Sequence, residues 1–295
     1  MRAVNQPESW WGWHGWDQPQ PLSIVEVLQA GTMPPRLAAA FWLGLERGAS
    51  FVFAADPPGA GKTTILTALL AFTTPETLVY FTRGWGETFD LPPPSDDYPT
   101  YLLVNEMSDH LPVYSWGPYI VRIFELLAEG YSLCTTMHAD TVEGVVAQLE
   151  EDAGVAREHL AHLTFVVPLA IVHREGATLR RVRDVGLFGP SAGSGQAPAQ
   201  GSGQAFAERR IARWDEKRDT FSVLDEPAQI AAFAQRLGID PAAVEGELAR
   251  RESFLEGLLS GGVDGIESVQ DAVNAFRDRS SESFSSVRPV RRRLF

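Results

Sequence analysis

The chain has 295 residues, 44% of them hydrophobic and 21% charged, a composition typical of a globular protein and unlike a disordered or fibrous one. The formal net charge is −13, and because most of the acidic excess lies in residues 1–205, nucleic acid is disfavoured as a partner. A single cysteine excludes an internal disulfide, and without a membrane-length apolar run or the apolar core of a signal peptide we expect a cytoplasmic protein.

Residues 1–21 are interpreted as an N-terminal arm that is polar and rich in tryptophan. Its tryptophans crowd together at Trp10, Trp11, Trp13 and Trp16. They could form a patch for a partner or a membrane surface, but we favour an arm that folds back onto its own domain. A helical pattern follows over residues 24–47, interrupted by a glycine and by a pair of prolines.

Apolar strands and helices then alternate, which predicts an α/β fold with a mainly parallel sheet covered on both faces. The expected strands are 51–55, 77–82, 100–104 and 132–137, and the expected helices are 63–72, 119–128 and 141–150. Two strand-like runs within 163–187 are expected to close this core as a hairpin. The core domain therefore spans 22–188 in this interpretation.

The rest of the chain is predicted to hold a small, mostly helical C-terminal region. Residues 189–205 are rich in Gly, Ser, Ala and Gln and are typical of a flexible linker. Residues 206–277 are expected to form a hairpin followed by helices, and 278–295 a disordered basic tail. Three consecutive arginines in that tail could touch anionic lipid or nucleic acid, although a solvated tail is the simpler interpretation.

A glycine-rich segment joins the strand 51–55 to the helix that follows it. It consists of Gly59, Ala60, Gly61, Lys62, Thr63 and Thr64. In this context backbone N–H groups and the helix N-terminus can surround phosphates, Lys62 can reach the β- and γ-phosphates, and Thr63 can bind Mg²⁺. The alternative is a strand-to-helix turn without a ligand. Asp56 replaces the first glycine of the G-x-x-x-x-G-K-[ST] pattern, either as a turn residue or as a charge that weakens ATP binding.

Two further polar residues follow strands of the same predicted sheet. Glu106 follows the strand 100–104, where a carboxylate can activate water or hold Mg²⁺ through water, although an exposed Glu at a strand end is the simpler alternative. His138 follows the strand 132–137, where a lone His is often structural. Because ligands bind beyond the carboxyl ends of parallel strands, Lys62, Glu106 and His138 are expected to share one crevice.

The order GAGKTT, LLVNEMSD and TTMHADTVEGVVAQL resembles the type II/IV secretion ATPase superfamily, which includes pilus-assembly, conjugation and archaeal-type secretion ATPases. The resemblance implies a RecA-like P-loop ATPase core, ATP and Mg²⁺ as cofactors, and a ring, usually of six subunits. It makes Glu106 the catalytic glutamate and His138 the residue that couples the γ-phosphate state to movement. It also implies an inner-membrane platform or pilin-machinery partner, a place at the inner face of the membrane, and Glu87 as an acidic metal residue.

Several positions depart from the pattern of that superfamily. Ser108 replaces the arginine of G-E-I-R-D, the stretch 88–105 has no Lys or Arg, and the large N-terminal domain of the family has no room before residue 50. Slow hydrolysis is therefore one expectation. The basic positions that could substitute, or could instead form structural ion pairs, are Arg180, Arg181 and Arg183.

Three functions remain open from the sequence. The first is an ATP-hydrolysing motor of a secretion or pilus-type machine. The second is a nucleotide-binding regulatory or scaffold protein of the same fold with little turnover. A small-molecule phosphotransferase is the weakest of the three, since the sequence has no evident lid region and gives His138 no role in that chemistry.

Overall fold

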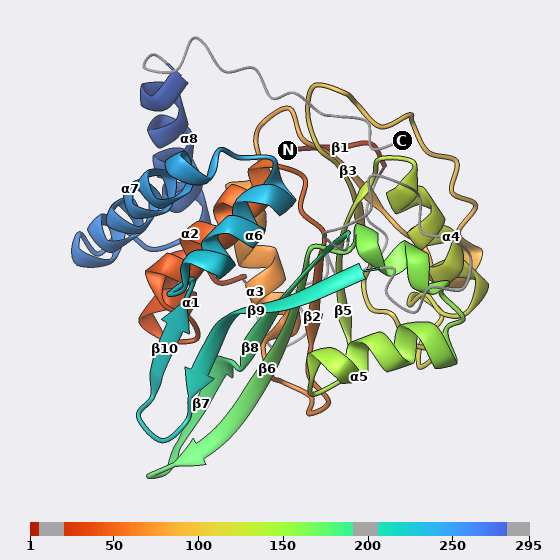
Figure 1. Ribbon diagram of the computed structural model, residues 1–295, viewed down its shortest axis with the longest axis horizontal. Helices are drawn as coiled ribbons and strands as arrows, with labels where there is room; N and C mark the ends of the chain where they lie inside the picture. The colour runs from red at the N-terminus through yellow and green to blue at the C-terminus, as the bar shows by residue number, and fades with distance from the viewer. Residues whose placement is uncertain (6–20, 191–205, 282–295) are drawn as a thin grey trace.

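The computed structural model describes residues 1–5, 21–190 and 206–281 (Figure 1). The tryptophan cluster, nearly all of the predicted linker 189–205 and most of the predicted tail 278–295 lie outside the described residues. Among the described helices, none combines the length and the apolar character needed to cross a bilayer. The predicted α/β fold class with a mainly parallel sheet is confirmed.

Ten strands of the described chain form a single sheet. They are β1 (Arg2–Ala3), β2 (Phe51–Ala54), β3 (Leu78–Phe81), β4 (Thr100–Leu103), β5 (Ser132–Met137), β6 (Phe165–Arg174), β7 (Ala177–Val182), β8 (Asp184–Pro190), β9 (Phe206–Asp215) and β10 (Thr220–Val223). The order is β1-β3-β4-β5-β2-β6-β8-β9-β10, and β7 pairs with β6 beside this path. All pairs from β1 to β6 are parallel, and those among β6 to β10 are antiparallel.

The register of the parallel strands brings three carboxyl ends to one edge of the sheet. Ala54 of β2 pairs with Met137 of β5, and Leu103 of β4 pairs with Cys134. The segments that follow β2, β4 and β5 therefore leave the sheet next to one another. In an open parallel sheet this edge is where ligands bind.

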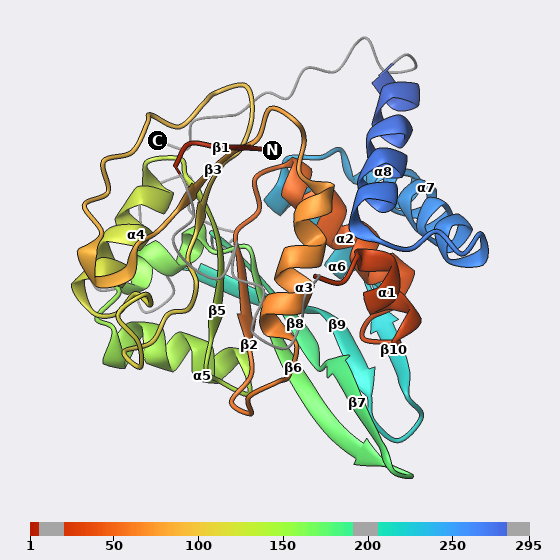
Figure 2. The same cartoon turned by 180° about the vertical axis from the view of Figure 1, so that it is seen from behind.

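Helices cover both faces of the sheet, as Figures 1 and 2 show from opposite sides. The helices are α1 (Ile24–Gln29), α2 (Pro35–Glu46), α3 (Lys62–Leu69), α4 (Pro118–Ala128), α5 (Val142–Ala147), α6 (Pro227–Leu237), α7 (Pro241–Ser260) and α8 (Ile266–Ser281). Short 3₁₀ turns lie at Leu70–Phe72, Gly84–Gly86 and Arg157–His162, and a π turn, Gln148–Asp152, extends α5. Helices α4 and α5 lie on one face, and α1, α2, α3, α6, α7 and α8 on the other.

Alternate residues of each central strand supply the two hydrophobic cores. Phe51 and Phe53 of β2 belong to the core beneath α1–α3, whereas Val52 and Ala54 belong to the core beneath α4 and α5. This alternation follows from the two-residue period of a strand, and all four side chains are buried because the sheet is covered on both faces.

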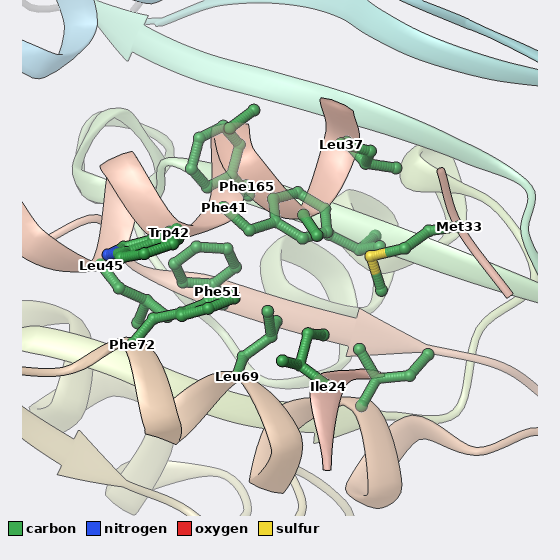
Figure 3. Packing of buried hydrophobic residues seen from close by; sticks show 14 of the residues in the cluster. Ile24, Met33, Leu37, Phe41, Trp42, Leu45, Phe51, Leu69, Phe72 and Phe165 are labelled. Carbon is green, nitrogen blue, oxygen red and sulfur yellow. The ribbon is translucent and has the colours of Figure 1, made fainter. Parts of the chain in front are cut away.

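Aromatic side chains fill the larger core (Figure 3). The ring of Phe41 on α2 lies 5.5 Å from that of Phe51 and 5.6 Å from that of Phe165, measured between centroids. On the same helix, Trp42 stacks on Phe72 at 4.6 Å with an interplanar angle of 3°. These contacts fasten α2 between the sheet and the turn that ends α3, the helix that carries the phosphate loop.

The C-terminal region completes the same core. The hairpin predicted at the start of 206–277 forms as β9 and β10 and extends the sheet through β8. Side chains of α6, α7 and α8, including Phe233, Leu248 and Val273, join the core beneath α2. The C-terminal helices thus pack on the domain that carries the predicted site.

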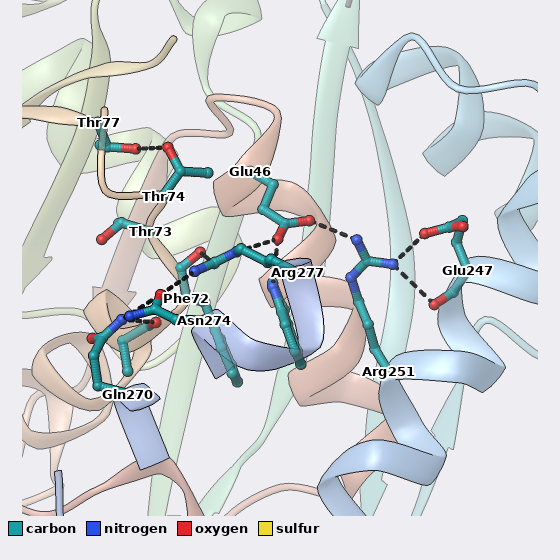
Figure 4. A network of polar contacts seen from close by, with 12 residues as sticks. Glu46, Phe72, Thr73, Thr74, Thr77, Glu247, Arg251, Gln270, Asn274 and Arg277 are labelled. Atoms are coloured by element: carbon teal, nitrogen blue, oxygen red, sulfur yellow. Dashed lines mark hydrogen bonds and ion pairs between the residues drawn. The ribbon is translucent and has the colours of Figure 1, made fainter. Parts of the chain in front are cut away.

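An ion-pair network ties α7 and α8 to α2 (Figure 4). Glu46 accepts from Arg251 at 2.6 Å through Oε2 and from Arg277 at 2.9 Å through Oε1, and the indole of Trp42 donates to it at 2.7 Å. Burial acts to raise the pKa of the Glu46 carboxyl, but the two arginines outweigh it and hold that pKa below its usual value. Arg251 and Arg277 therefore share the Glu46 carboxylate, and Arg251 also pairs with Glu247 on α7.

Candidate functional site

The glycine-rich segment forms a loop between β2 and α3. Gly59 has a φ of +76° and Gly61 a φ of +93°, a left-handed conformation that glycine adopts without a steric penalty. Gly61 precedes the first residue of α3, and no described side chain caps the first turn of this helix. The N–H groups of that turn therefore remain available for an anion. Gly59 and Thr63 are exposed at the loop, and Ala60 is buried beneath it.

Lys62 is held across the base of this loop. Its ammonium is buried, donates to the carbonyl of Ala55 at 3.0 Å and lies 3.9 Å from Oε2 of Glu106. Burial lowers the pKa of Lys62 below its usual value, while Glu106, Asp56 and Asp140 act in the opposite direction. Lys62 is therefore a partly desolvated cation whose charged form these three carboxylates favour.

Glu106 lies buried beyond the end of β4, and its backbone is fixed on both sides. Its carbonyl accepts from the N–H of Ser115 at 3.0 Å, and the next N–H, of Met107, donates to Thr136 at 2.9 Å. The carboxylate oxygen Oε1 accepts from the Ser108 hydroxyl at 3.0 Å and faces Nε2 of His138 at 3.0 Å. The other oxygen faces Lys62. The carboxylate is thus oriented between a cation and an imidazole.

His138 joins the end of β5 to both neighbouring segments. Its Nδ1 lies 3.3 Å from the carbonyl of Asp56, and its Nε2 contacts Glu106. Its own carbonyl accepts from Nε2 of Gln148 at 2.5 Å. Gln148 begins the π turn that ends α5, so a helix distortion delivers the amide to the histidine segment. The expectation that Lys62, Glu106 and His138 share one crevice agrees with this geometry.

Asp56 is fixed through its backbone at the position where the loop pattern has a glycine. Its N–H donates to Oδ1 of Asp140 at 3.1 Å, and its carbonyl faces His138. Its side chain is exposed. The carboxylate of Asp140, two residues after His138, thus anchors the backbone of the phosphate loop.

The three basic residues proposed as substitutes for the missing arginines have different contacts. Nε of Arg180 donates to the carbonyl of Gly59 at 2.7 Å, and Nη1 of Arg183 donates to the carbonyl of Asp140 at 3.2 Å, and both side chains are exposed. Arg181 is buried and binds Asp219 through two hydrogen bonds of 2.8 and 2.9 Å. Arg180 and Arg183 thus border the loop, whereas Arg181 is an internal support.

The Glu87 carboxylate accepts hydrogen bonds from residues of β3 and of the segment that follows it. It accepts from the Tyr80 hydroxyl at 2.9 Å and from the N–H groups of Arg83 and Phe89 at 2.8 and 2.7 Å. These contacts close the turn after β3, and burial together with Glu87 raises the pKa of Tyr80 to about 12. A role of Glu87 at a metal stays a prediction.

Sequence reasoning missed His110. Its ring lies 5.2 Å from that of His138 between centroids, and Glu106, His110 and His138 each offer a ligand atom within 4.8 Å of the others. His110 comes directly after Asp109 in the chain, but it fits no motif and lies on an exposed loop. Only the folding of that loop toward β5 shows the relationship.

Comparisons with known proteins give distant similarities. The chain is 23% identical to one uncharacterised protein of Methanocaldococcus jannaschii over 89% of its own length and 50% of that protein, so it spans half of that relative. It is 22% identical to a second uncharacterised protein of the same organism, over 79% of this chain and 90% of the other. No protein-family model matches.

Two solved structures that the chain matches distantly are the ATPase DotB of Legionella pneumophila and that of Yersinia pseudotuberculosis. The first has a TM-score of 0.34 at 13% identity, over 80% of this chain and 55% of DotB. The second has a TM-score of 0.36 at 13% identity, over 86% of this chain and 63% of DotB.

Proposed function

We propose that the chain binds Mg²⁺-ATP at the loop Gly59–Thr64 and hydrolyses it. One observation carries the proposal: the ends of three strands deliver Lys62, Glu106 and His138 to one place, with 3.9 Å between Lys62 and Glu106 and 3.0 Å between Glu106 and His138. A strand-to-helix turn without a ligand would not require a buried lysine facing a buried carboxylate.

The residues present fit the groups of a nucleotide. The loop offers uncapped helix N–H groups and Lys62 to phosphate oxygens, with Lys62 directed to the β- and γ-phosphates. The Thr63 hydroxyl would hold Mg²⁺ directly and Glu106 would hold it through water, since hydroxyl and carboxylate oxygens are ligands that this ion prefers. The metal would neutralise phosphate charge, as it does in related chemistry.

Glu106 is the proposed base for the attacking water. Its Oε1 is held by Ser108 and His138, so the carboxylate cannot rotate freely and Oε2 is presented on the side of Lys62. The water would lose its proton to this carboxylate as it attacks the γ-phosphorus, and the bond from that phosphorus to the oxygen bridging it to the β-phosphate would break to release ADP. His138 is then placed to sense the phosphate, because it contacts both Glu106 and the loop carbonyl of Asp56.

A motor of a secretion or pilus-type machine is the version of this activity that we favour. Its support is the order of the three motifs and the contact of Gln148 with His138, since Gln148-Leu149 occupies the position of the paired residues that follow the histidine in that superfamily. On this proposal the chain works as a subunit of a ring, which in that superfamily usually has six subunits. The ring would act at the cytoplasmic face of a membrane, on a platform or pilin-machinery protein.

A nucleotide-binding regulatory or scaffold protein with little turnover is the second candidate. The observation that favours it is the charge around Lys62, where Glu106, Asp56 and Asp140 all act on the ammonium. Arg180 and Arg183 border the loop and offset part of this negative charge. On this proposal, the balance between the three acidic side chains and the two arginines determines whether bound ATP is hydrolysed.

Turnover of Mg²⁺-ATP by the wild-type chain and by Glu106→Gln tests the proposal. We expect the amide to lower kcat by about a hundredfold or more while ATP binding persists, because it keeps the shape of the side chain but cannot accept the proton. A wild type that binds ATP but turns over no faster than the variant would favour the regulatory candidate. Sizing with a non-hydrolysable analogue then decides whether a ring forms.

A further inference from the structure

Two histidines and a carboxylate converge beside the phosphate loop. Glu106 is buried, His138 is partly exposed and His110 is exposed, and their ligand atoms lie within 4.8 Å of one another. Among the described residues, these three form the one group of His, Cys, Asp or Glu side chains whose ligand atoms are close enough together to hold a metal ion. ATP hydrolysis as proposed above uses Glu106 and His138, but it gives His110 no role.

We propose that Glu106, His110 and His138 form a binding site for a transition-metal ion of the zinc type. Imidazole nitrogens suit Zn²⁺, Co²⁺ and Ni²⁺, whereas Mg²⁺ takes oxygen ligands, so the two histidines separate this site from the magnesium position at Thr63. Three protein ligands leave a fourth position for water, the arrangement found in open zinc sites.

The separations of the ligand atoms agree with such an ion. Ligands of a tetrahedral zinc with bonds of about 2.0–2.1 Å lie about 3.3 Å apart. Oε1 of Glu106 and Nε2 of His138 are already 3.0 Å apart. His110 can close the remaining distance by rotating its side chain, since 61% of that side chain is exposed and its Nε2 has only a 3.8 Å contact with Asp109.

Two of the three ligands are held in place by neighbouring groups. Glu106 accepts from the Ser108 hydroxyl at 3.0 Å and its carbonyl accepts from the N–H of Ser115. The carbonyl of His138 accepts from Gln148 at 2.5 Å, and the ring is bounded on its other side by the carbonyl of Asp56. Supporting hydrogen bonds of this kind orient metal ligands and increase their affinity.

A bound ion would compete with the proposed hydrolysis, and this consequence rests on the proposed function. Coordination occupies the Glu106 carboxylate that the attacking water needs and the Nε2 of His138. Zinc-type ions would therefore inhibit turnover while Mg²⁺ supports it. His110 would set how readily that inhibition occurs, because it is the ligand that hydrolysis does not use.

Titration of the full chain with Co²⁺ in the absence of nucleotide tests the site directly. We expect one equivalent to give the visible absorption of a tetrahedral ion, with displacement by Zn²⁺ and no thiolate band, because the one cysteine, Cys134, is buried in the core. His110→Asn should weaken Co²⁺ binding by about tenfold or more. Binding of equal strength in wild type and His110→Asn would overturn the proposal.

Two other variants control for histidines elsewhere. His173→Asn should leave the titration unchanged, because His173 is exposed and contacts Thr178 on β7. His159→Asn tests the pair His159 and His162, whose rings lie 6.2 Å apart between centroids. Loss of Co²⁺ binding in His159→Asn, with binding retained in His110→Asn, would also overturn the proposal.

Turnover measured with Mg²⁺-ATP and added Zn²⁺ separates this inference from the proposed function. We expect Zn²⁺ to inhibit the wild type reversibly, with a chelator restoring activity, and His110→Asn to need about tenfold more Zn²⁺ for the same inhibition. A chain that binds Co²⁺ through His110 but never hydrolyses ATP would contradict the proposed function alone. A chain that hydrolyses ATP but binds no Co²⁺ would contradict the metal site alone.

Discussion

The side-chain amide of Gln148 donates to the backbone carbonyl of His138 at 2.5 Å, and this bond joins the π turn after α5 to the end of β5. Because His138 contacts both Glu106 and the loop carbonyl of Asp56, the bond fixes the segment that carries the imidazole. A helix distortion and a strand end are thereby coupled at the candidate site.

Gln148→Ala should lower kcat for ATP by between about tenfold and a hundredfold, with little change in ATP affinity, because the imidazole loses its position while the phosphate loop is untouched. Steady-state kinetics together with direct binding of a fluorescent nucleotide measure both quantities. Gln270→Ala is the matched control, since Gln270 on α8 donates to the carbonyl of Ala71, away from the site. An equal decrease in kcat for both variants would contradict the positioning role.

The local pattern predicted the central elements closely. Residues 51–55 and 132–137 were expected as strands and form β2 and β5, because short apolar runs bounded by glycine and polar residues fit a covered parallel sheet. The convergence of Lys62 and Glu106 followed from the rule that parallel strands share one carboxyl edge. These features could be predicted because they depend on residues close together in the sequence and on the periodicity of apolar positions.

Other features depend on contacts between distant segments, which periodicity does not encode. The pairing of β1 with β3 joins residues 2–3 to 78–79, and no pattern in either segment specifies the other. The bond from Asp56 to Asp140 and the approach of His110 to His138 depend on how two loops fold over the sheet edge. His110 in particular is one exposed histidine whose partners are set by loop geometry.

The ion-pair network around Glu46 should dominate the attachment of the C-terminal helices. Glu46→Gln removes the buried carboxylate that Arg251 and Arg277 share, and only Arg251 keeps a second acidic partner, Glu247. We expect the free energy of unfolding to fall by about 3 kcal/mol. Chemical denaturation measures the change. Glu252→Gln is the control: it removes a partly exposed ion pair with Arg36, so its effect should stay below about 1 kcal/mol. Equal losses of unfolding free energy in the two variants would show that the buried network stabilises the fold no more than the partly exposed pair does.

The pair formed by Arg181 and Asp219 should give the protein a stability component that is lost in acid. Hydrogen bonding from Arg181 lowers the pKa of the Asp219 carboxyl from 3.8 to about 2. Because the folded pKa is depressed, the contribution is present above about pH 4 and is lost as the pH falls toward 2. The stability difference between wild type and Asp219→Asn should therefore shrink across this window.

Thermal denaturation of the two proteins from pH 6 to pH 2 measures that difference. Asparagine is the suitable replacement because residue 219 has a φ of +50°, a conformation that Asn tolerates better than most residues. A difference that stays constant down to pH 2 would show that the charge of Asp219 does not stabilise the fold.

Arg180 should contribute to nucleotide affinity and not to the stability of the fold, whereas its neighbour Arg181 should contribute to stability. Arg180 is exposed and its guanidinium reaches the carbonyl of Gly59, so Arg180→Ala removes a positive charge from the edge of the phosphate loop. We expect Mg²⁺-ATP to bind about tenfold more weakly, with an unchanged melting temperature. Arg181→Ala should instead lower the melting temperature, because it breaks the buried end of the pair with Asp219. Equal nucleotide affinity in wild type and Arg180→Ala would exclude Arg180 as the substitute for a missing arginine.

Asp56→Gly tests the residue that departs from the phosphate-loop pattern. The Asp56 carboxylate acts on Lys62 electrostatically, but the residue also holds the loop through its N–H bond to Asp140 and its carbonyl contact with His138. Glycine keeps both backbone contacts and removes the charge, so Mg²⁺-ATP should bind about threefold to tenfold more tightly at low salt. The gain should diminish as ionic strength rises, because the side chain is exposed and its field is screened. Calorimetric titration at two salt concentrations measures both effects. An unchanged affinity at low salt would mean that Asp56 serves the turn through its backbone alone, and would remove its charge from the factors that oppose ATP at this loop.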